Sequence, residues 1–291
     1  MRVGVVFPQT EIGSDPGAIK EYAQSVEQLG FRHILAYDHV IGANPASRPG
    51  WHPPYTYLDP FHEPFVLFSY LAGLTKQLEL VTGILILPQR QTVLVAKQAA
   101  ALDVLSGGRL RLGIGIGWNP VEYEGLGADF KNRGSRSEEQ VEVLRKLWTT
   151  ELITFEGRWH KITDAGIKPL PVQRPIPVWF GGSDDRVLRR LAKLGDGWFP
   201  LLAPDEKCRA MIEKIRNYAS QLGRNPDAIA IEGRISYGQG SAEAWLKDLQ
   251  AWKDLGAGYV SFNTMKAGIA SPAAHIEAIR RFQASTAGSW S

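Results

Sequence analysis

The 291-residue chain has a single cysteine, Cys208, so no disulfide can form within it and no cysteine-based metal site is predicted. It also lacks a basic block: 33 Lys and Arg side chains are scattered against 30 Asp and Glu, and the formal net charge is +3. This scatter argues against a nucleic-acid partner. No apolar run approaches the ~18 residues of a membrane span and no leader precedes the first apolar segment, so we expect a cytoplasmic protein that does not act at a membrane.

Several catalytic signatures are missing as well. His52 and His62 are separated by loop sequence, and no set of His, Asp and Glu has the spacing of a metal site. The chain has neither the Gly-x-Ser-x-Gly turn of serine hydrolases nor a catalytic Cys/His pair. We therefore predict no metal centre and no nucleophile of these types.

What the chain does have is a regular alternation of strand-like and helix-like segments. This alternation predicts a parallel sheet, and a count of eight favours a closed (β/α)8 TIM barrel over a doubly wound open sheet. No change of composition marks a second domain, so residues 1–291 are predicted to form one domain with an insertion at about 118–177. The expected strands are Val3–Phe7, Phe31–Ala36, Leu78–Leu87, Leu110–Gly117, Val178–Phe180, Gly197–Pro200, Ile229–Ile235 and Tyr259–Asn263.

Within the insertion, the pattern predicts a helix that starts at Ser137. Ser137 is expected to be its N-cap, with Gln140 completing a capping box. A hairpin is expected over Ile153–Ile162.

The fourth expected strand carries Gly113, Gly115 and Gly117 at alternate positions. Residues two apart in a strand point to the same face, so one face of this strand has no side chains. Glycines weaken a strand, and their alignment predicts backbone that lies close to something flat, such as a ring-shaped cofactor. The alternative is a dinucleotide fingerprint, but its glycines lie in a turn that opens a helix rather than inside an apolar run.

In barrels the active site is built at the carboxyl ends of the strands. The second expected strand ends at Asp38-His39, and His39 is either a general acid or base or a structural histidine. The fourth ends at Trp118-Asn119, where Trp118 either stacks on a planar ligand or plugs the barrel mouth.

The fifth expected strand ends at Gly181-Gly182-Ser183, which leads into a helix. This turn either binds a phosphate at the helix N-terminus or is an ordinary turn with Ser183 or Asp184 as N-cap. The loop Ile41–His62 is rich in aromatic residues that form either the wall of a substrate pocket or the loop's own packing. These aromatic residues are Trp51, Tyr55, Tyr57 and Phe61.

Taken together, these segments resemble the bacterial luciferase-like monooxygenase superfamily, and within it the oxidoreductases that use the deazaflavin coenzyme F420. The resemblance covers most of the chain and is densest over Tyr37–Gly127 and Pro177–Pro200. The matching segments are Asp38-His39-Val40, Thr82–Leu85 with Pro88 and Arg90, Ala96-Lys97-Gln98, Leu102–Arg109, Gly113–Trp118, Gly181–Ser183 and Gly195–Trp198.

This resemblance implies a TIM-like barrel with an insertion after the fourth strand, and F420 as cofactor, or FMN as in other members. It places Asp38 and His39 beside the deazaflavin. It also implies a bulge in the third strand, with a non-proline cis peptide between Gly83 and Ile84 that backs the ring. The expected cofactor-binding residues are Asp38, Thr82, Gly83, Ile84, Gly117, Asn119, Gly181, Gly182 and Ser183.

The function we predict on this basis is hydride transfer between F420 and a small organic substrate. His39 would assist protonation, Asp38 would orient it or contact the ring, and Trp118 would shape the cavity. Some sugar-phosphate-oxidising relatives carry a catalytic Glu where this chain has Trp118, which argues against that substrate class and leaves Glu122 nearby.

Two alternatives remain: an FMN-dependent monooxygenase fed by a partner reductase, and a non-catalytic flavin- or deazaflavin-binding protein. Relatives are often dimers, so a homodimer is expected, with a flavin or F420 reductase as electron source.

Overall fold

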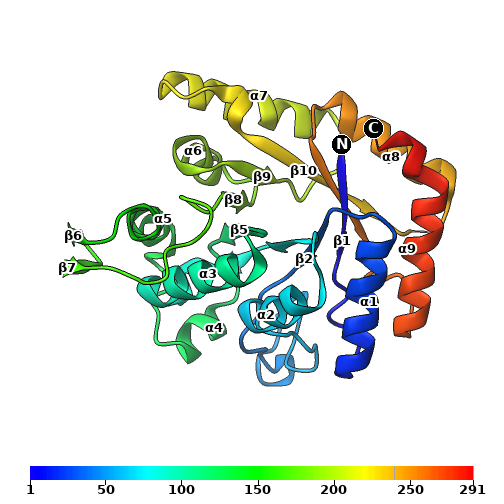
Figure 1. Ribbon diagram of the computed structural model, residues 1–291, viewed down its shortest axis with the longest axis horizontal. Helices are drawn as coiled ribbons and strands as arrows, with labels where there is room; N and C mark the ends of the chain where they lie inside the picture. Colours follow the sequence, from blue (N-terminus) through cyan, green and yellow to red (C-terminus); the bar gives the residue numbers. More distant parts are fainter. Residues whose placement is uncertain (239, 291) are drawn as a thin grey trace.

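The computed structural model describes residues 1–238 and 240–290, and its main sheet is an eight-stranded parallel barrel surrounded by helices (Figure 1). The strands follow the order β3-β2-β1-β11-β10-β9-β8-β5, and pairing between β3 and β5 closes the ring. The predicted (β/α)8 architecture is therefore confirmed. The strands are β1 (Arg2–Val6), β2 (His33–Ala36), β3 (Glu79–Thr82), β4 (Leu85–Ile86), β5 (Leu110–Gly115), β8 (Val178–Gly181), β9 (Gly197–Phe199), β10 (Ala230–Ser236) and β11 (Tyr259–Asn263).

Helices return the chain from one strand to the next along the outside of the barrel. They are α1 (Pro16–Gln28), α2 (Pro64–Leu74), α3 (Thr92–Ser106), α6 (Asp185–Leu194), α7 (Glu206–Gln221), α8 (Ala242–Asp254) and α9 (Pro272–Thr286). The two chain ends lie close together (Figure 1), and the Met1 ammonium donates to the carbonyl of Trp290 over 2.7 Å. In the described part of the chain, no helix is both long and apolar enough to cross a membrane.

The third barrel strand is interrupted, which corrects the continuous strand expected over Leu78–Leu87. β3 ends at Thr82, β4 starts at Leu85, and the peptide bond between Gly83 and Ile84 is cis. The bulge implied by the family resemblance is therefore present. Both halves pair with β5, β3 through Leu80 and β4 through Leu85.

Apolar side chains form two cores because successive strand residues point to opposite sides. Leu112 and Ile114 of β5 point outward and pack in the large core between barrel and helices. A smaller cluster fills the barrel interior with Val6, Leu35, Val81, Trp179, Phe199 and Met265. The interior is thus a packed core below the mouth of the barrel, as in other barrels of this kind.

A buried ionic network, which the sequence analysis missed, lies inside the barrel beside this cluster. Arg111 of β5 is hydrogen-bonded to Glu232 of β10 and lies 2.9 Å from the carboxylate of Glu79. The His33 imidazole lies 3.0 Å from Glu232, which also accepts from Ser261. Burial alone would raise the pKa of Glu232, but the charges of Arg111 and His33 outweigh it and hold that pKa well below its usual range.

The insertion contains α4 (Pro120–Gly125), α5 (Arg133–Thr149) and a hairpin of β6 (Ile153–Glu156) and β7 (Lys161–Ala165). The predicted hairpin is therefore present, and it projects beyond α5 (Figure 1). The predicted capping box is wrong, because α5 begins one turn before Ser137. Ser137 donates back to the carbonyl of Gly134, and Gln140 donates to Thr92 at the start of α3, which ties the two helices together.

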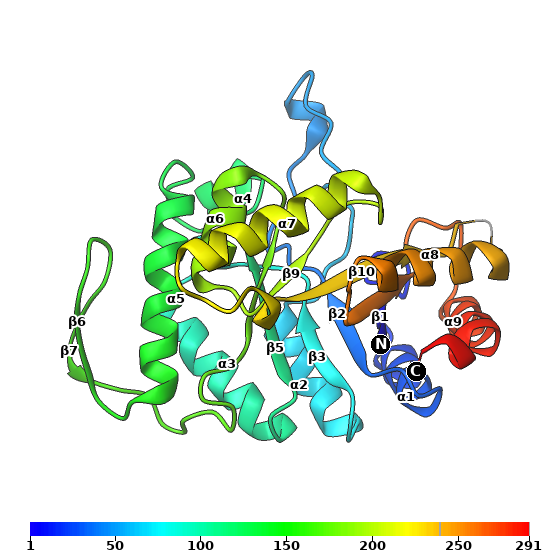
Figure 2. The same cartoon turned by 90° about the horizontal axis from the view of Figure 1, so that it is seen from above.

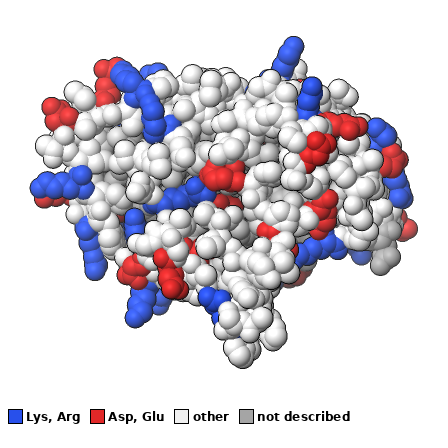
Figure 3. All heavy atoms as spheres, turned by 90° about the horizontal axis from the view of Figure 1, so that it is seen from below, with Lys and Arg blue, Asp and Glu red and all other residues white. Residues whose placement is uncertain are grey.

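The segment between β2 and α2 projects away from the barrel (Figure 2). It contains a short 3₁₀ helix, Pro45–Ser47, capped by the side chain of Asn44. On the face drawn in Figure 3, charged side chains of both signs are interspersed. That distribution agrees with the scattered charges of the sequence.

Candidate active site

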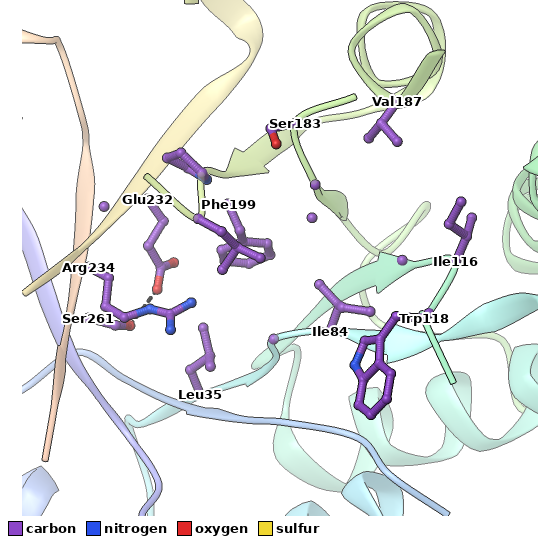
Figure 4. A pocket seen from close by; sticks show the side chains of 18 of the residues that line it. Leu35, Ile84, Ile116, Trp118, Ser183, Val187, Phe199, Glu232, Arg234 and Ser261 are labelled. Carbon is purple, nitrogen blue, oxygen red and sulfur yellow. Dashed lines mark hydrogen bonds between the residues drawn. The ribbon is translucent and has the colours of Figure 1, made fainter. Parts of the chain in front are cut away.

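A cavity of about 420 Å³ opens at the carboxyl ends of the barrel strands (Figure 4). Val6, Leu35 and Phe199 make much of its wall apolar, whereas Glu232 and Arg234 of β10 bring charge to one side. A small apolar pocket with few polar groups is the usual form of a cofactor or substrate site. The predicted site residues that line it are Gly83, Ile84, Gly117, Trp118, Gly181, Gly182 and Ser183.

The glycine face of β5 receives the β3–β4 bulge. A Cβ on Gly113 would lie 2.0 Å from the carbonyl oxygen of Thr82, and one on Gly115 would lie 2.3 Å from Cδ1 of Ile84. Close approach was therefore predicted correctly, but the neighbour at these two positions is protein rather than a flat ligand. Ile84 is held in this way against the bare strand and forms part of the cavity wall.

Thr82 and Asp38 support the bulge from outside the cavity. The Thr82 hydroxyl donates to the carbonyl of Gly113 over 2.7 Å. The two Asp38 oxygens accept from the Ile86 amide at 2.9 Å and from the Arg90 guanidinium at 2.7 Å. Burial raises the pKa of Asp38, although Arg90 acts in the opposite direction. Asp38 is thus directed at the bulge rather than bonded to His39, and the alternative prediction, that it contacts the cofactor ring, stays a prediction.

The carboxylate that reaches His39 is Glu122 of α4, a fully buried side chain. Both Glu122 oxygens lie 3.3 Å from Nδ1 of His39, and one accepts the Val40 amide over 2.7 Å. Asn119 does not line the cavity but caps α4, accepting from the Val121 amide over 3.1 Å. This cap starts α4 so that its first turn directs Glu122 inward, leaving Nε2 of His39 as the nitrogen available to another molecule.

His39 does not line the cavity itself but packs against Trp118, which does. Their ring centroids are 5.7 Å apart, with the rings edge to face. Tyr55 and Phe61 pack on His39 at 5.2 and 4.8 Å, and Trp51 lies 6.2 Å from Trp118. Trp51, Tyr55 and Phe61 therefore pack around the His39–Trp118 pair, as the packing interpretation expects, whereas Tyr57 is exposed. Their role as the wall of a substrate pocket stays a prediction.

The turn Gly181-Gly182-Ser183 joins β8 to α6 along the cavity wall. Gly182 has φ +111°, a conformation that L side chains rarely adopt. Asp184 is the N-cap of α6, accepting from the Arg186 amide over 3.0 Å. The turn thus offers main chain and the Ser183 hydroxyl to the cavity, while one helix amide is already satisfied by Asp184.

A second hollow, a groove of about 760 Å³, shares Ile116, Asp184 and Val187 with the cavity. Six cations line it against two carboxylates, Glu138 and Asp184. The sequence analysis missed this groove because its cations come from the start of α5 and from α6, which only the fold brings together. The cations are Lys131, Arg133, Arg186, Arg189, Arg190 and Lys193.

The charged residues of β10 were also missed. Glu232 and Arg234 are two apart in a strand, so both point into the barrel. Charge at alternate positions of an otherwise apolar strand was the available signal. Among residues 1–238 and 240–290, no group of three or more His, Cys, Asp and Glu side chains is arranged to hold a metal ion.

Proteins similar to this chain include enzymes named for either FMN or F420. Uncharacterized protein Rv0940c of Mycobacterium tuberculosis is 36% identical over 165 residues, 57% of each chain. The FMNH(2)-dependent dimethylsulfone monooxygenase of Pseudomonas putida is 29% identical over 208 residues, 70% of this chain and 54% of that one. The chain thus matches little more than half the length of these relatives.

A solved F420-dependent secondary alcohol dehydrogenase, in complex with an F420-acetone adduct, has a TM-score of 0.79 at 19% identity over 97% of both chains. That likeness shows the shared fold. Residues 1–289 match the family model for luciferase-like monooxygenases, which covers nearly the whole sequence. The chain therefore belongs to the luciferase-like monooxygenase family.

Proposed function

We propose that this chain is an oxidoreductase that transfers hydride between coenzyme F420 and a small organic substrate. The observation that carries the choice of F420 is the cation-lined groove beside Gly181–Ser183. F420 extends from its ring through a phosphodiester into a chain of glutamates, whereas FMN ends at one phosphate. Three of the six cations are paired within the protein, Arg189 with Asp185 and both Arg190 and Lys193 with Glu138. Lys131, Arg133 and Arg186 are then left to face a ligand with several negative charges, which suits the tail of F420.

The cavity next to the groove fits the ring of such a cofactor. Its wall at the bulge is the Ile84 side chain, and the absence of side chains at Gly115 and Gly181 keeps this region open, because a Cβ there would lie within 3 Å of Ile84. Cavity and groove meet at Ile116, Asp184 and Val187. We therefore assign the ring to the cavity and the anionic tail to the groove.

When bound, F420 supplies hydride chemistry at C5 of its ring, and the protein supplies orientation and exclusion of water. Trp118 and the loop aromatics cover the mouth beside His39. With Nδ1 held by Glu122, His39 offers Nε2 for holding or delivering a proton at the substrate.

The test is a fluorescence titration of one preparation with F420, with its tail-less deazariboflavin chromophore and with FMN. We expect F420 to bind at least about tenfold more tightly than the tail-less chromophore, since several charge-assisted contacts are lost with the tail. Added salt should reduce that difference because the groove is open to solvent. Tighter binding of FMN than of F420 would overturn the proposal.

Variants of the groove sharpen this test. Lys131→Ala and Arg186→Ala should weaken F420 binding and leave the tail-less chromophore unaffected. Lys20→Ala on α1, far from the groove in sequence and fold, is the control. If the groove variants weakened the binding of both ligands equally, the groove would not be the binding site of the F420 tail.

The second candidate is a monooxygenase that uses reduced FMN supplied by a partner reductase. Similarity to the FMNH(2)-dependent dimethylsulfone monooxygenase favours it. Oxygen consumption that requires reduced FMN would support this candidate, whereas F420-dependent turnover without oxygen would contradict it. A chain that binds either cofactor but turns over no substrate would point to a binding protein.

A further inference from the structure

Arg234 brings a positive charge to a largely apolar part of the cavity wall. It lies near the carboxyl end of β10, and its guanidinium points into the cavity, between Glu232 and Leu35 in the view of Figure 4. The neighbouring cavity wall contains Val6, Leu35 and Phe199, which offer it no acceptor. Arg234 is only partly buried, so its charge is solvated and accessible to a ligand that enters the cavity.

No described residue pairs with that charge. Arg234 makes no side-chain hydrogen bond or ion pair within the described part of the chain. Its guanidinium carbon lies over the Tyr37 ring, 5.6 Å from the ring centroid. Glu232 is nearby, but its oxygens are occupied by Arg111, His33 and Ser261. Arg111 shows the contrast, since it is held by two carboxylates.

The topology places Arg234 away from the assigned ring position. β10 and the β3–β4 strand are four places apart in the ring of eight, so they face each other across the barrel. A ring packed against Ile84 therefore turns its open face toward Arg234. The space between them is where a substrate would lie, and the guanidinium is on the substrate's side.

We propose that Arg234 binds a carboxylate of the substrate, which makes this enzyme specific for small monocarboxylic acids. A guanidinium presents paired donors that match the two oxygens of a carboxylate. Arg111 and its two carboxylates, Glu79 and Glu232, already carry one net negative charge nearby, so a monoanion bound at Arg234 adds less repulsion than a phosphate dianion would. The inference rests on the proposed function only for the position of the cofactor ring.

Tyr37 packs against the Arg234 guanidinium at this end of the barrel. The Tyr37 hydroxyl is buried and has no hydrogen-bond partner among the described residues. Tyr55, from the projecting loop, packs with Tyr37 against the barrel-interior cluster. A substrate carboxylate would thus meet the Arg234 guanidinium, and the rest of a small molecule would lie against apolar side chains of the cavity wall such as Val6, Leu35 and Phe199.

The test is calorimetric titration of the chain with benzoate and with its neutral isostere benzamide, first without cofactor. We expect wild type to bind benzoate about 10- to 100-fold more tightly than benzamide, the range for a hydrogen bond to a charged group. Arg234→Met should abolish this preference without weakening benzamide binding. Arg234→Lys should retain part of it, because the charge remains but the paired donors are lost.

Arg280→Met is the matched control, since Arg280 is exposed on α9 and pairs with Glu277. It should keep the full preference for benzoate. Thermal unfolding of each variant shows whether the fold is intact, and Arg234→Lys keeps the test informative if Arg234→Met is unstable.

Three results would overturn the proposal: no benzoate binding to wild type, equal binding of benzoate and benzamide, or a preference that survives in Arg234→Met. Loss of F420 affinity in Arg234→Met with an unchanged benzoate preference would assign the residue to the cofactor instead. Because the first titration contains no cofactor, failure of F420 binding would affect the proposed function and leave the Arg234 result standing.

Discussion

Glu122 and His39 form a pair that joins the insertion to the second barrel strand. The two carboxylate oxygens lie 3.3 Å from Nδ1, and the same carboxylate accepts the Val40 amide over 2.7 Å. Glu122 thus fixes both the imidazole and the backbone that follows it. An imidazole whose Nδ1 faces a carboxylate keeps its proton there and presents Nε2 outward.

Glu122→Gln tests whether this pair serves the reaction. The amide keeps the size of the side chain but loses its charge, so we expect kcat to fall about tenfold or more with little change in cofactor affinity. Unfolding free energy should fall by about 1–2 kcal/mol because a charge-assisted hydrogen bond is weakened. Steady-state kinetics across pH and urea unfolding measure the two effects.

Glu124→Gln is the control for that prediction, because Glu124 is exposed on the same helix. It should behave as wild type in both measurements. A Glu122→Gln enzyme with an unchanged pH profile and kcat would make the pair purely structural.

Most of the architecture was predictable from local patterns. The spacing of apolar residues, and the turn residues between segments, predicted eight strands and the barrel, because each strand is bounded by a helix or a glycine turn. The role of Glu122 was not predictable, since it depends on where α4 directs its side chain relative to His39, which follows β2 and lies 83 positions earlier in the chain. The groove and Arg234 escaped for the same reason: their meaning depends on which charges meet in space and which remain unpaired.

Gly113→Ala should be strongly destabilising. Its Cβ would lie 2.0 Å from the carbonyl oxygen of Thr82 and 2.6 Å from the Phe199 ring, so the bulge would have to shift. We expect a loss of at least about 3 kcal/mol in unfolding free energy, the upper range for overpacking. Urea unfolding of the purified variant gives the value.

Gly73→Ala is the matched substitution for Gly113→Ala. Gly73 lies in α2, and a Cβ there meets nothing within 4 Å. It should stabilise the protein by up to about 1 kcal/mol, because alanine is the better helix former. Similar losses in the two variants would contradict the close contact between β5 and the bulge.

Thr82→Val removes the hydroxyl that bonds β3 to β5 beside the bulge. Because the site is buried, the Gly113 carbonyl loses a hydrogen-bond donor that water cannot replace, and we expect a loss of about 1–3 kcal/mol in unfolding free energy. Thr149→Val is the comparison: its hydroxyl makes a similar bond to Arg145, but in an exposed position. Its loss should be well under that of Thr82→Val, and the reverse order would contradict the supporting role of Thr82.

Stability at acid pH should depend on Glu232. Its pKa in the folded protein lies below the ordinary value of 4.5, so the unfolded chain takes up its proton first as pH falls. The stabilisation is therefore complete above about pH 5 and is lost progressively as pH drops below 4.5. Glu232→Gln should cost about 3–5 kcal/mol at pH 7, because Arg111 loses a buried partner.

The same substitution should flatten the dependence of unfolding free energy on pH between 5 and 3, since the group that releases stability there is gone. Glu156→Gln, at an exposed hairpin position, should leave both the pH 7 value and the slope near wild type. Urea unfolding at pH 7, 5, 4 and 3 provides the comparison. A slope in Glu232→Gln equal to that of wild type would mean that other carboxylates, and not the barrel network, control the acid sensitivity of the fold.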